Sequence, residues 1–243
     1  FHKLDYVENT VHLIFIEKSY TVSSVLTEQR NMREIWGIGT PRSFRPIWVC
    51  EELDLEYQHH AIGPRTGETQ QPEFTALNRK RKIPFYRDER VSLSESVAIC
   101  RYLAHNFSEG QLAVPDTPEA FAKEDEWAAY IYGEIDETGL YVMRRHGDLG
   151  AIYGESPQVS AAAESYVGRH FEVIAERLTD ESTLMPCGFG LADILLMSCL
   201  DWAIAYGVAL PLALQGYYEC HNARPAYQRA MKINYPDLFG GDA

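Results

Sequence analysis

Four consecutive cations, Arg79 to Lys82, stand directly before the dipeptide Ile83-Pro84 in this chain of 243 residues. The whole chain carries a formal net charge of −13, so the positive charge here is local. A proline at the start of a strand is tolerated because its missing N–H is not needed there. A cis bond before Pro84 would turn the backbone of Ile83 outward as an edge able to pair with an extended peptide, and an ordinary trans proline is the alternative. The segment indicates a local site for a negatively charged ligand.

A second polar group, Ser94-Glu95-Ser96, opens the run SVAICRYLAHNF, whose apolar residues recur at helical spacing. We expect Ser94 to cap this helix. The first-turn N–H groups have no helical partner, and together with the helix dipole they attract a carboxylate. Glu95 also offers a carboxylate to an ammonium group. Plain helix capping is the alternative explanation for these residues.

The composition limits the class of protein. An acidic chain with a pI near 5.0 repels a polyanion, so we expect no nucleic-acid partner. Five cysteines are dispersed without CxxC or metal-type spacing, which predicts reduced, buried thiols, no metal site and a cytoplasmic location. The apolar runs are too short to span a bilayer and no secretory leader is recognisable, so we expect no membrane partner.

The elements that must position these residues alternate in type after Met32. In order, we expect a strand over Arg33–Ile38, a helix over Ser43–Leu53, a strand over Glu56–Ile62, a loop over 63–73, a hairpin over 83–93 and a helix from Ser94. A strand, helix and strand of these lengths form a parallel pair with a right-handed crossover. The order predicts an α/β domain with a mixed four-stranded sheet.

Strand signals almost vanish after residues 108–118, whose glycine and prolines are typical of a linker. The helices expected beyond it are Glu119–His146, Ser160–Leu178, Leu191–Tyr206 and Leu212–Lys232. The predicted organisation is an extension of uncertain structure over 1–31, with an extra edge strand as the alternative, an α/β domain over 32–107, the linker, and an all-helical domain over 119–243.

The stretch Asn78–Leu103, NRKRKIPFYRDERVSLSESVAICRYL, resembles the cytosolic glutathione S-transferase family in its Ile-Pro pair, short hairpin and following Glu-Ser-x-Ala-Ile block. Arg42–Tyr57 is similar to the family's first helix and second strand, and Phe189–Ala203 resembles its core helix with the N-terminal Asp193. The resemblance covers the chain from about Met32 onward. It implies a thioredoxin-like domain followed by an all-α domain, the GST fold, with glutathione as a substrate.

The resemblance also implies a role for each matching residue. The backbone of Ile83 pairs with the cysteinyl unit of glutathione, and Pro84 is the cis proline. Glu95 faces the ammonium of the γ-glutamyl unit and Ser96 its carboxylate. Lys82 approaches the glycyl carboxylate.

Two departures from the family pattern stand out. Arg79 and Arg81 replace a proline and a glycine, which makes the loop bulkier and more cationic. Gly190 stands where a serine or threonine usually caps the core helix, and glycine is a cap weaker by only a few tenths of a kcal/mol. The first departure bears on the glycyl end of the ligand and the second on stability.

The thiol-activating residue of the family is a Tyr, Ser or Cys near the end of the first strand. This region reads WGIGTPRSF, with no cysteine and with Trp36 in the approximate place of the tyrosine. The resemblance therefore implies a hydroxyl-activated, Ser/Thr type, with Thr40 as the first choice and Ser43 as the second. A hydroxyl that donates to a thiolate lowers the thiol pKa. Turn formation and helix capping are the alternative roles of both residues.

The second substrate is expected between the domains, where pockets are common. Trp127, Tyr130 and Tyr141 are the acceptor-site residues we predict, with Arg144 or Arg145 nearby, and interdomain core is the alternative role of the aromatic side chains.

The expected function is a homodimeric glutathione transferase whose bound thiolate attacks a small electrophilic, apolar acceptor. One alternative is a non-catalytic glutathione-binding or regulatory protein of the same fold. The other is a specialised glutathione-dependent lyase that cleaves ethers or removes halogens.

Overall fold

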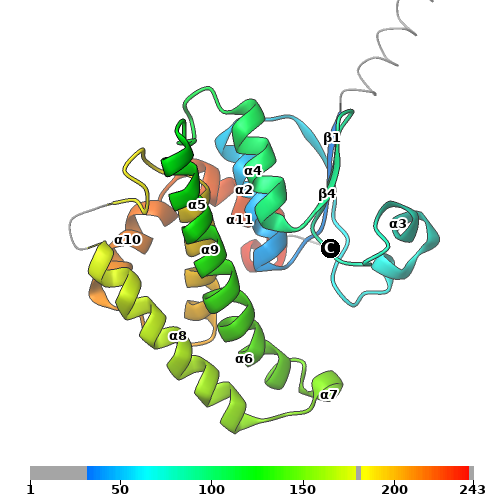
Figure 1. Cartoon of the computed structure of the whole chain (residues 1–243). Helices are drawn as coiled ribbons and strands as arrows, with labels where there is room; N and C mark the ends of the chain where they lie inside the picture. The colour runs from blue at the N-terminus through cyan, green and yellow to red at the C-terminus, as the bar shows by residue number, and fades with distance from the viewer. Residues whose placement is uncertain (1–31, 179–181, 241–243) are drawn as a thin grey trace, which may run out of the picture.

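A computed structural model of the chain describes residues 32–178 and 182–240. The extension predicted over residues 1–31 lies outside the described residues. Figure 1 shows a small sheet with its helices on one side of the molecule and a bundle of longer helices on the other.

Within the described residues the sheet has four strands in the order β2-β1-β3-β4. Their bounds are Arg33–Trp36 for β1, Tyr57–His60 for β2, Phe85–Arg87 for β3 and Ser92–Ser94 for β4. The pairing of β1 with β2 is parallel, whereas the pairings of β1 with β3 and of β3 with β4 are antiparallel. The predicted mixed four-stranded sheet is therefore confirmed.

Alternation along the strands divides the side chains between two faces of the sheet. Ile35 and Tyr86, paired in register, belong to the main core, which includes apolar side chains of α2 (Pro41–Glu52) and α4 (Ser96–Phe107). The next pair in the register, Trp36 and Phe85, lies on the opposite face of the sheet. There the two side chains are buried with Phe74 of α3 (Pro72–Leu77). The sheet thus carries helices on both faces (Figure 1).

Two expectations for this part of the chain are wrong. The predicted loop over 63–73 contains η1 (Glu68–Gln70) and the start of α3. The ring of Phe74 in α3 packs against the ring of Phe85 in β3, which holds α3 on the sheet. Ser94 does not cap α4, because it is still paired in β4 and the cap position falls to Glu95. Strand pairing of Ser94 with Phe85 is a nonlocal interaction, and it overrides the local preference of serine for a helix cap.

The second part of the described chain is helical, apart from an isolated bridge between Ala113 and Gly190. A long rod is built from α5 (Pro118–Tyr130), the π-helix η2 (Ile131–Leu140) and α6 (Tyr141–His146). It is followed by α7 (Gly150–Tyr153), α8 (Pro157–Arg177), α9 (Leu191–Ala205), α10 (Leu212–Asn222), α11 (Pro225–Asn234) and η3 (Pro236–Phe239). The single helix predicted over Leu212–Lys232 is wrong, because Pro225 cannot continue α10 and instead opens α11.

Helix α2 is the element that joins the two parts. Its Phe44 and Trp48 are buried against Tyr227 of α11, with ring centroids 5.5 and 5.1 Å apart. The ring of Trp48 also lies 5.5 Å from the ring of Phe189, just ahead of the largely buried helix α9. Because one continuous core runs through this junction, the start of α2 is held rigidly relative to the helical part.

All five cysteines are free. Cys50, Cys100 and Cys199 are buried as expected, but Cys187 and Cys220 are exposed, so the prediction of buried thiols is wrong for these two. Among the described residues no helix is both long and apolar enough to cross a membrane.

Candidate functional site

A cavity of about 410 Å³ opens between the two parts of the chain. It brings together four of the site residues predicted from sequence: Thr40, Lys82, Ile83 and Tyr141. The α/β part also contributes Pro41, Arg42, Pro64, Arg65, Gly67, Thr69, Gln70 and Arg81, and the helical part contributes Arg144, Ile152, Tyr153 and Trp202.

Thr40 is the N-cap of α2, and its side chain belongs to a tight hydrogen-bond cluster. Its Oγ1 accepts from the Ser43 backbone N–H at 3.0 Å and lies 2.9 Å from the Ser43 Oγ. The side-chain nitrogen of Asn234, at the end of α11, donates to the Thr40 carbonyl at 3.1 Å, and Gly39 N–H donates to the Asn234 carbonyl at 2.9 Å. The end of α11 therefore holds the loop that carries Thr40 in place.

The two predicted thiol activators differ in access. Ser43 is fully buried, and its Oγ has the Thr40 carbonyl and the Asn234 Oδ1 as acceptors, at 3.0 and 2.8 Å. Thr40 is 8% exposed and lines the cavity. Its hydroxyl hydrogen has only the Ser43 Oγ as an acceptor among the described residues. A charged acceptor in the cavity competes well with that neutral oxygen, because charge-assisted hydrogen bonds are the stronger kind.

The Ile83-Pro84 bond is cis, and Pro84 is buried behind the cavity wall. Within the part of the chain that the structure describes, neither the N–H nor the C=O of Ile83 has a hydrogen-bond partner. The preceding loop is held by Asn78, whose side-chain nitrogen donates to the Lys82 carbonyl at 2.8 Å. An extended peptide can therefore pair with the backbone of Ile83.

Glu95 and Ser96 lie at the start of α4, outside the cavity lining. Glu95 has a positive φ of 81° and a half-exposed side chain, whose Oε1 is 2.6 Å from the Lys80 Nζ. Ser96 is buried, and its Oγ accepts from Arg45 at 3.2 Å. Since the Ser96 hydroxyl hydrogen has no acceptor among the described residues, it is available to a carboxylate.

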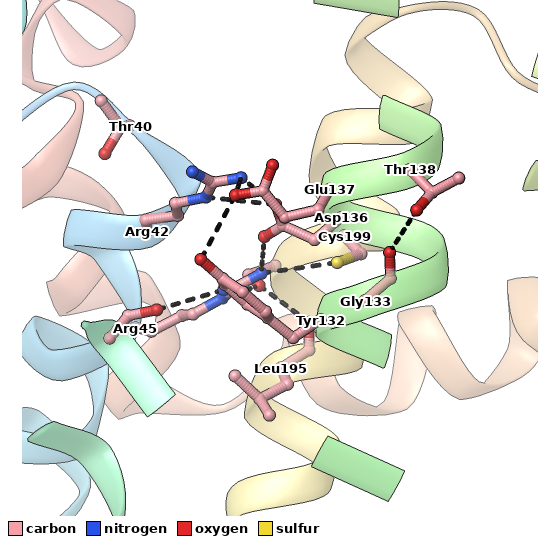
Figure 2. Close-up of polar contacts among 12 residues, drawn as sticks. Thr40, Arg42, Arg45, Tyr132, Gly133, Asp136, Glu137, Thr138, Leu195 and Cys199 are labelled. Carbon is pink, nitrogen blue, oxygen red and sulfur yellow. Dashed lines mark hydrogen bonds and ion pairs between the residues drawn. The ribbon is translucent and has the colours of Figure 1, made fainter. Parts of the chain in front are cut away.

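A buried ion network contacts Ser96 through Arg45, and it was not predicted from the sequence. Arg45 is fully buried and donates to the Asp136 Oδ2 at 2.6 Å and to the Ser198 Oγ at 2.7 Å. Figure 2 shows both Arg45 and Arg42 reaching from α2 to Asp136 on η2. Burial is the largest single effect and works to lower the pKa of Arg45, but the charge and hydrogen bond of Asp136 together with Cys199 raise the pKa overall. A signal was available in the sequence, since Arg42 and Arg45 stand three residues apart, and Arg45 directly precedes the apolar run from Pro46 to Cys50.

The structure brings only one of the three predicted acceptor-site aromatics to the cavity. Tyr141 lines it, with its ring centroid 6.5 Å from that of Trp202. Trp127 is buried elsewhere under the Arg177 guanidinium, and the Tyr130 hydroxyl is 2.7 Å from the His170 Nδ1. All three lie on the same long helical rod, but Trp127 and Tyr130 stand at the end of α5 and Tyr141 at the start of α6, so the ten residues of η2 separate them along the rod.

A four-stranded sheet with a cis proline before β3, followed by an all-helical bundle, defines a thioredoxin-like domain with a helical C-terminal part. Residues 34–105 match the family described as glutathione S-transferase, N-terminal domain. The chain is 31% identical to glutathione S-transferase GstA of Escherichia coli O157:H7 over 164 residues, which cover 65% of this chain and 77% of that protein. This chain belongs to the glutathione S-transferase family.

Two further comparisons agree. Glutathione S-transferase A of Pleuronectes platessa is 25% identical over 223 residues, covering 86% of this chain and 93% of that protein. A glutathione transferase structure from Pseudomonas putida, which has one glutathione disulfide bound per subunit, superposes with a TM-score of 0.73 at 24% identity, over 84% of this chain and 92% of that chain. The solved structure supports the fold.

Proposed function

We propose that this protein is a glutathione transferase of the hydroxyl-activated type. The Thr40 hydroxyl donates a hydrogen bond to the sulfur of bound glutathione and stabilises it as a thiolate. The thiolate then attacks an electrophilic acceptor in the cavity between the two parts of the chain. Family membership and the names of the relatives support glutathione as the thiol substrate.

The observation that carries the proposal is the position of Thr40 at the wall of the cavity beside Ile83. The unpaired N–H and C=O of Ile83 suit the cysteinyl unit of glutathione, whose sulfur then lies near the cavity wall that Thr40 helps to form. Ser43, behind Thr40, is a positioning residue in this proposal, because its backbone N–H donates to the Thr40 Oγ1.

The rest of glutathione fits the remaining polar groups. Ser96 offers a free hydroxyl hydrogen to the γ-glutamyl carboxylate, and the exposed Glu95 carboxylate faces the ammonium. Lys82 lines the cavity next to Ile83, and in this proposal it lies close to the glycyl carboxylate. Tyr141 and Trp202 give the cavity apolar walls for the acceptor. We also propose, from the family resemblance, a cytoplasmic homodimer with a glutathione-binding domain over 32–107 and a helical domain over 119–243.

The test measures glutathione binding by calorimetry and the ultraviolet absorbance of the thiolate as pH is varied, on wild type and Thr40→Ala. A hydrogen bond to a charged group contributes about 1.5–3 kcal/mol, so the pKa of the bound thiol is expected to rise by about one to two units in Thr40→Ala. Thr40→Ser keeps the hydroxyl and is expected to keep the wild-type pKa.

Loss of the α2 cap by itself costs about 1 kcal/mol of stability, so each variant is also unfolded in urea to show that it is folded in the assay. An unchanged thiol pKa in a folded Thr40→Ala protein refutes the role of Thr40. Binding without any thiolate in wild type identifies a non-catalytic binding protein, and absence of binding removes the whole proposal.

A further inference from the structure

Positive charge dominates the lining of the cavity in a protein that is strongly acidic overall. Five cations line it, Arg42, Arg65, Arg81, Lys82 and Arg144, and no Asp or Glu of the described chain does so. The positive charge of Arg42 is neutralised, since Arg42 forms ion pairs with Asp136 and Glu137. The other four make no ion pair with any described residue.

Two of these arginines occupy backbone conformations that side chains rarely adopt. Arg81 has a φ of 54° and Arg65 a φ of 64°. Such a conformation costs an ordinary residue roughly 1–2 kcal/mol and costs glycine nothing. Among the described residues, the Arg81 guanidinium donates a hydrogen bond only to a neutral group, the Gln70 Oε1 at 2.9 Å. Arg65 reaches Tyr153 across the cavity, since a hydrogen bond with its guanidinium is the main cause that lowers the pKa of the Tyr153 hydroxyl.

Arg144 is the cation on the acceptor side of the cavity. It belongs to α6 of the helical part, with its guanidinium carbon 6.0 Å from the centroid of the Trp202 ring. Its Nε is buried and has no acceptor among the described residues. The carboxylate one turn further on, Asp148, instead accepts from the Tyr206 hydroxyl at 2.5 Å. A buried, unpaired donor of this kind is costly unless a ligand accepts from it.

Glutathione cannot neutralise all of this charge. It has two carboxylates, and the proposed function places the γ-glutamyl one at Ser96, outside the cavity. Glutathione therefore brings two anions to the cavity, the thiolate at Thr40 and the glycyl carboxylate, which lies near Lys82 and Arg81 on the loop side. Arg144, on the opposite side beside Trp202 and Tyr141, is left without a partner.

We infer that the acceptor is an aromatic or similarly planar electrophile that carries a carboxylate, with its ring packed against Tyr141 and Trp202 and its carboxylate on Arg144. The inference rests on the proposed function and adds the chemical class of the acceptor. In the reaction the glutathione sulfur forms a bond to the electrophilic carbon and displaces a halide, while the thiol proton has already passed to solvent. Arg144 takes no part in the bond changes; it binds the acceptor.

The test compares two acceptors of nearly equal shape, 4-chloro-3,5-dinitrobenzoate and 4-chloro-3,5-dinitrobenzamide, at saturating glutathione. Each kcat/KM is divided by the rate constant of the same acceptor with free glutathione, which removes the difference in intrinsic reactivity. The quantity measured is the preference, the ratio of the normalised value for the anion to that for the amide. It is determined for wild type, Arg144→Gln, Arg144→Lys and Arg169→Gln.

A hydrogen-bonded ion pair in a partly buried site is worth at least a factor of about ten, so we expect a wild-type preference of about tenfold or more for the anion. Arg144→Gln is expected to abolish most of that preference through a higher KM for the anion, and Arg144→Lys to restore part of it. Arg169 is exposed on α8, outside the cavity, and its loss removes one charge without removing the site. Arg169→Gln is expected to keep the preference within about twofold, because solvent screens distant charges.

The possible failures are distinguishable. Conjugation of the amide with no preference for the anion in wild type overturns the inference and leaves the proposed function intact. A preference that survives in Arg144→Gln, with glutathione affinity unchanged by calorimetry, also overturns it. If neither acceptor is conjugated and no thiolate forms, the proposed function itself fails and the inference fails with it.

Discussion

Replacing Asp136 by asparagine tests whether the buried ion network holds the two parts of the protein together. The substitution keeps the shape of the side chain and removes one negative charge. Arg45 and Asp136 side chains are both fully buried, so the lost charge leaves the Arg45 guanidinium inside the protein without a carboxylate. Arg42, which pairs with the other oxygen of Asp136, loses the same partner.

The magnitude follows from burial. Two unit charges about 4 Å apart attract by about 4 kcal/mol at an effective dielectric constant of 20. Measured losses for breaking one side of a buried pair are about 3–5 kcal/mol. We therefore expect Asp136→Asn to lower the free energy of unfolding by about 3–5 kcal/mol, because the remaining donors of Arg45 to Ser198 and Ser96 reach only neutral oxygens.

Urea unfolding followed by tryptophan fluorescence measures this loss, with an unchanged slope indicating an unchanged unfolding transition. The matched control is Glu137→Gln, one residue along the same helix, whose side chain is 40% exposed and also contacts Arg42. Exposed pairs contribute about 0–1 kcal/mol, so this variant should unfold close to wild type. The double variant Arg45→Met with Asp136→Leu is expected to recover much of the loss. If Asp136→Asn unfolds no earlier than Glu137→Gln, the reasoning is refuted.

Two further predictions concern stability. Burial raises the pKa of Asp201 from 3.8 to about 6, with hydrogen bonds from tyrosines such as Tyr227 offsetting part of the effect. The folded state thus binds the Asp201 carboxyl proton more tightly than the unfolded state does, and the free energy of unfolding falls as pH rises from about 4 to about 6. Asp201→Asn has no such proton to lose. Its free energy of unfolding should therefore exceed that of wild type by up to about 3 kcal/mol at pH 7, and the difference should vanish near pH 4. Gly190→Ser should lower the free energy of unfolding in urea by about 1–3 kcal/mol, because the new Cβ would lie 2.6 Å from the Ala113 carbonyl oxygen. A variant more stable than wild type would show that the backbone at Ala113 moves aside at little cost.

The departures from the family pattern illustrate how much a sequence can explain. At Gly190 the sequence shows a cap weaker than serine, but only the packing against Ala113 shows why a side chain does not fit. At Arg81 the sequence shows an extra cation, whereas the structure adds its left-handed backbone and its place at the cavity. Ala113 is distant from Gly190 along the chain, and the cavity at Arg81 is completed by residues of the helical part such as Arg144, so no local pattern contains the contact or the cavity.

The architecture was largely determined by local patterns. The mixed sheet and the helical part could be predicted from the order of strands and helices, the spacing of apolar residues and the Ile83-Pro84 pair. These features depend on residues that are close together along the chain. The errors arose where a distant residue decides, as at Ser94, which pairs with Phe85 in the sheet. Pro225 is the exception, since its effect on helix continuation is local and could have been predicted.

The functional residues divide in the same way. The sequence by itself predicted, through its resemblance to the family, that Thr40, Ile83 and Ser96 bind and activate a thiol. Only the tertiary structure decided that Thr40 faces a cavity while Ser43 is buried, because that difference is made by Asn234, 191 residues beyond Ser43. It also decided which charges are paired, since Coulomb attraction and burial depend on distance in space and not on separation along the chain.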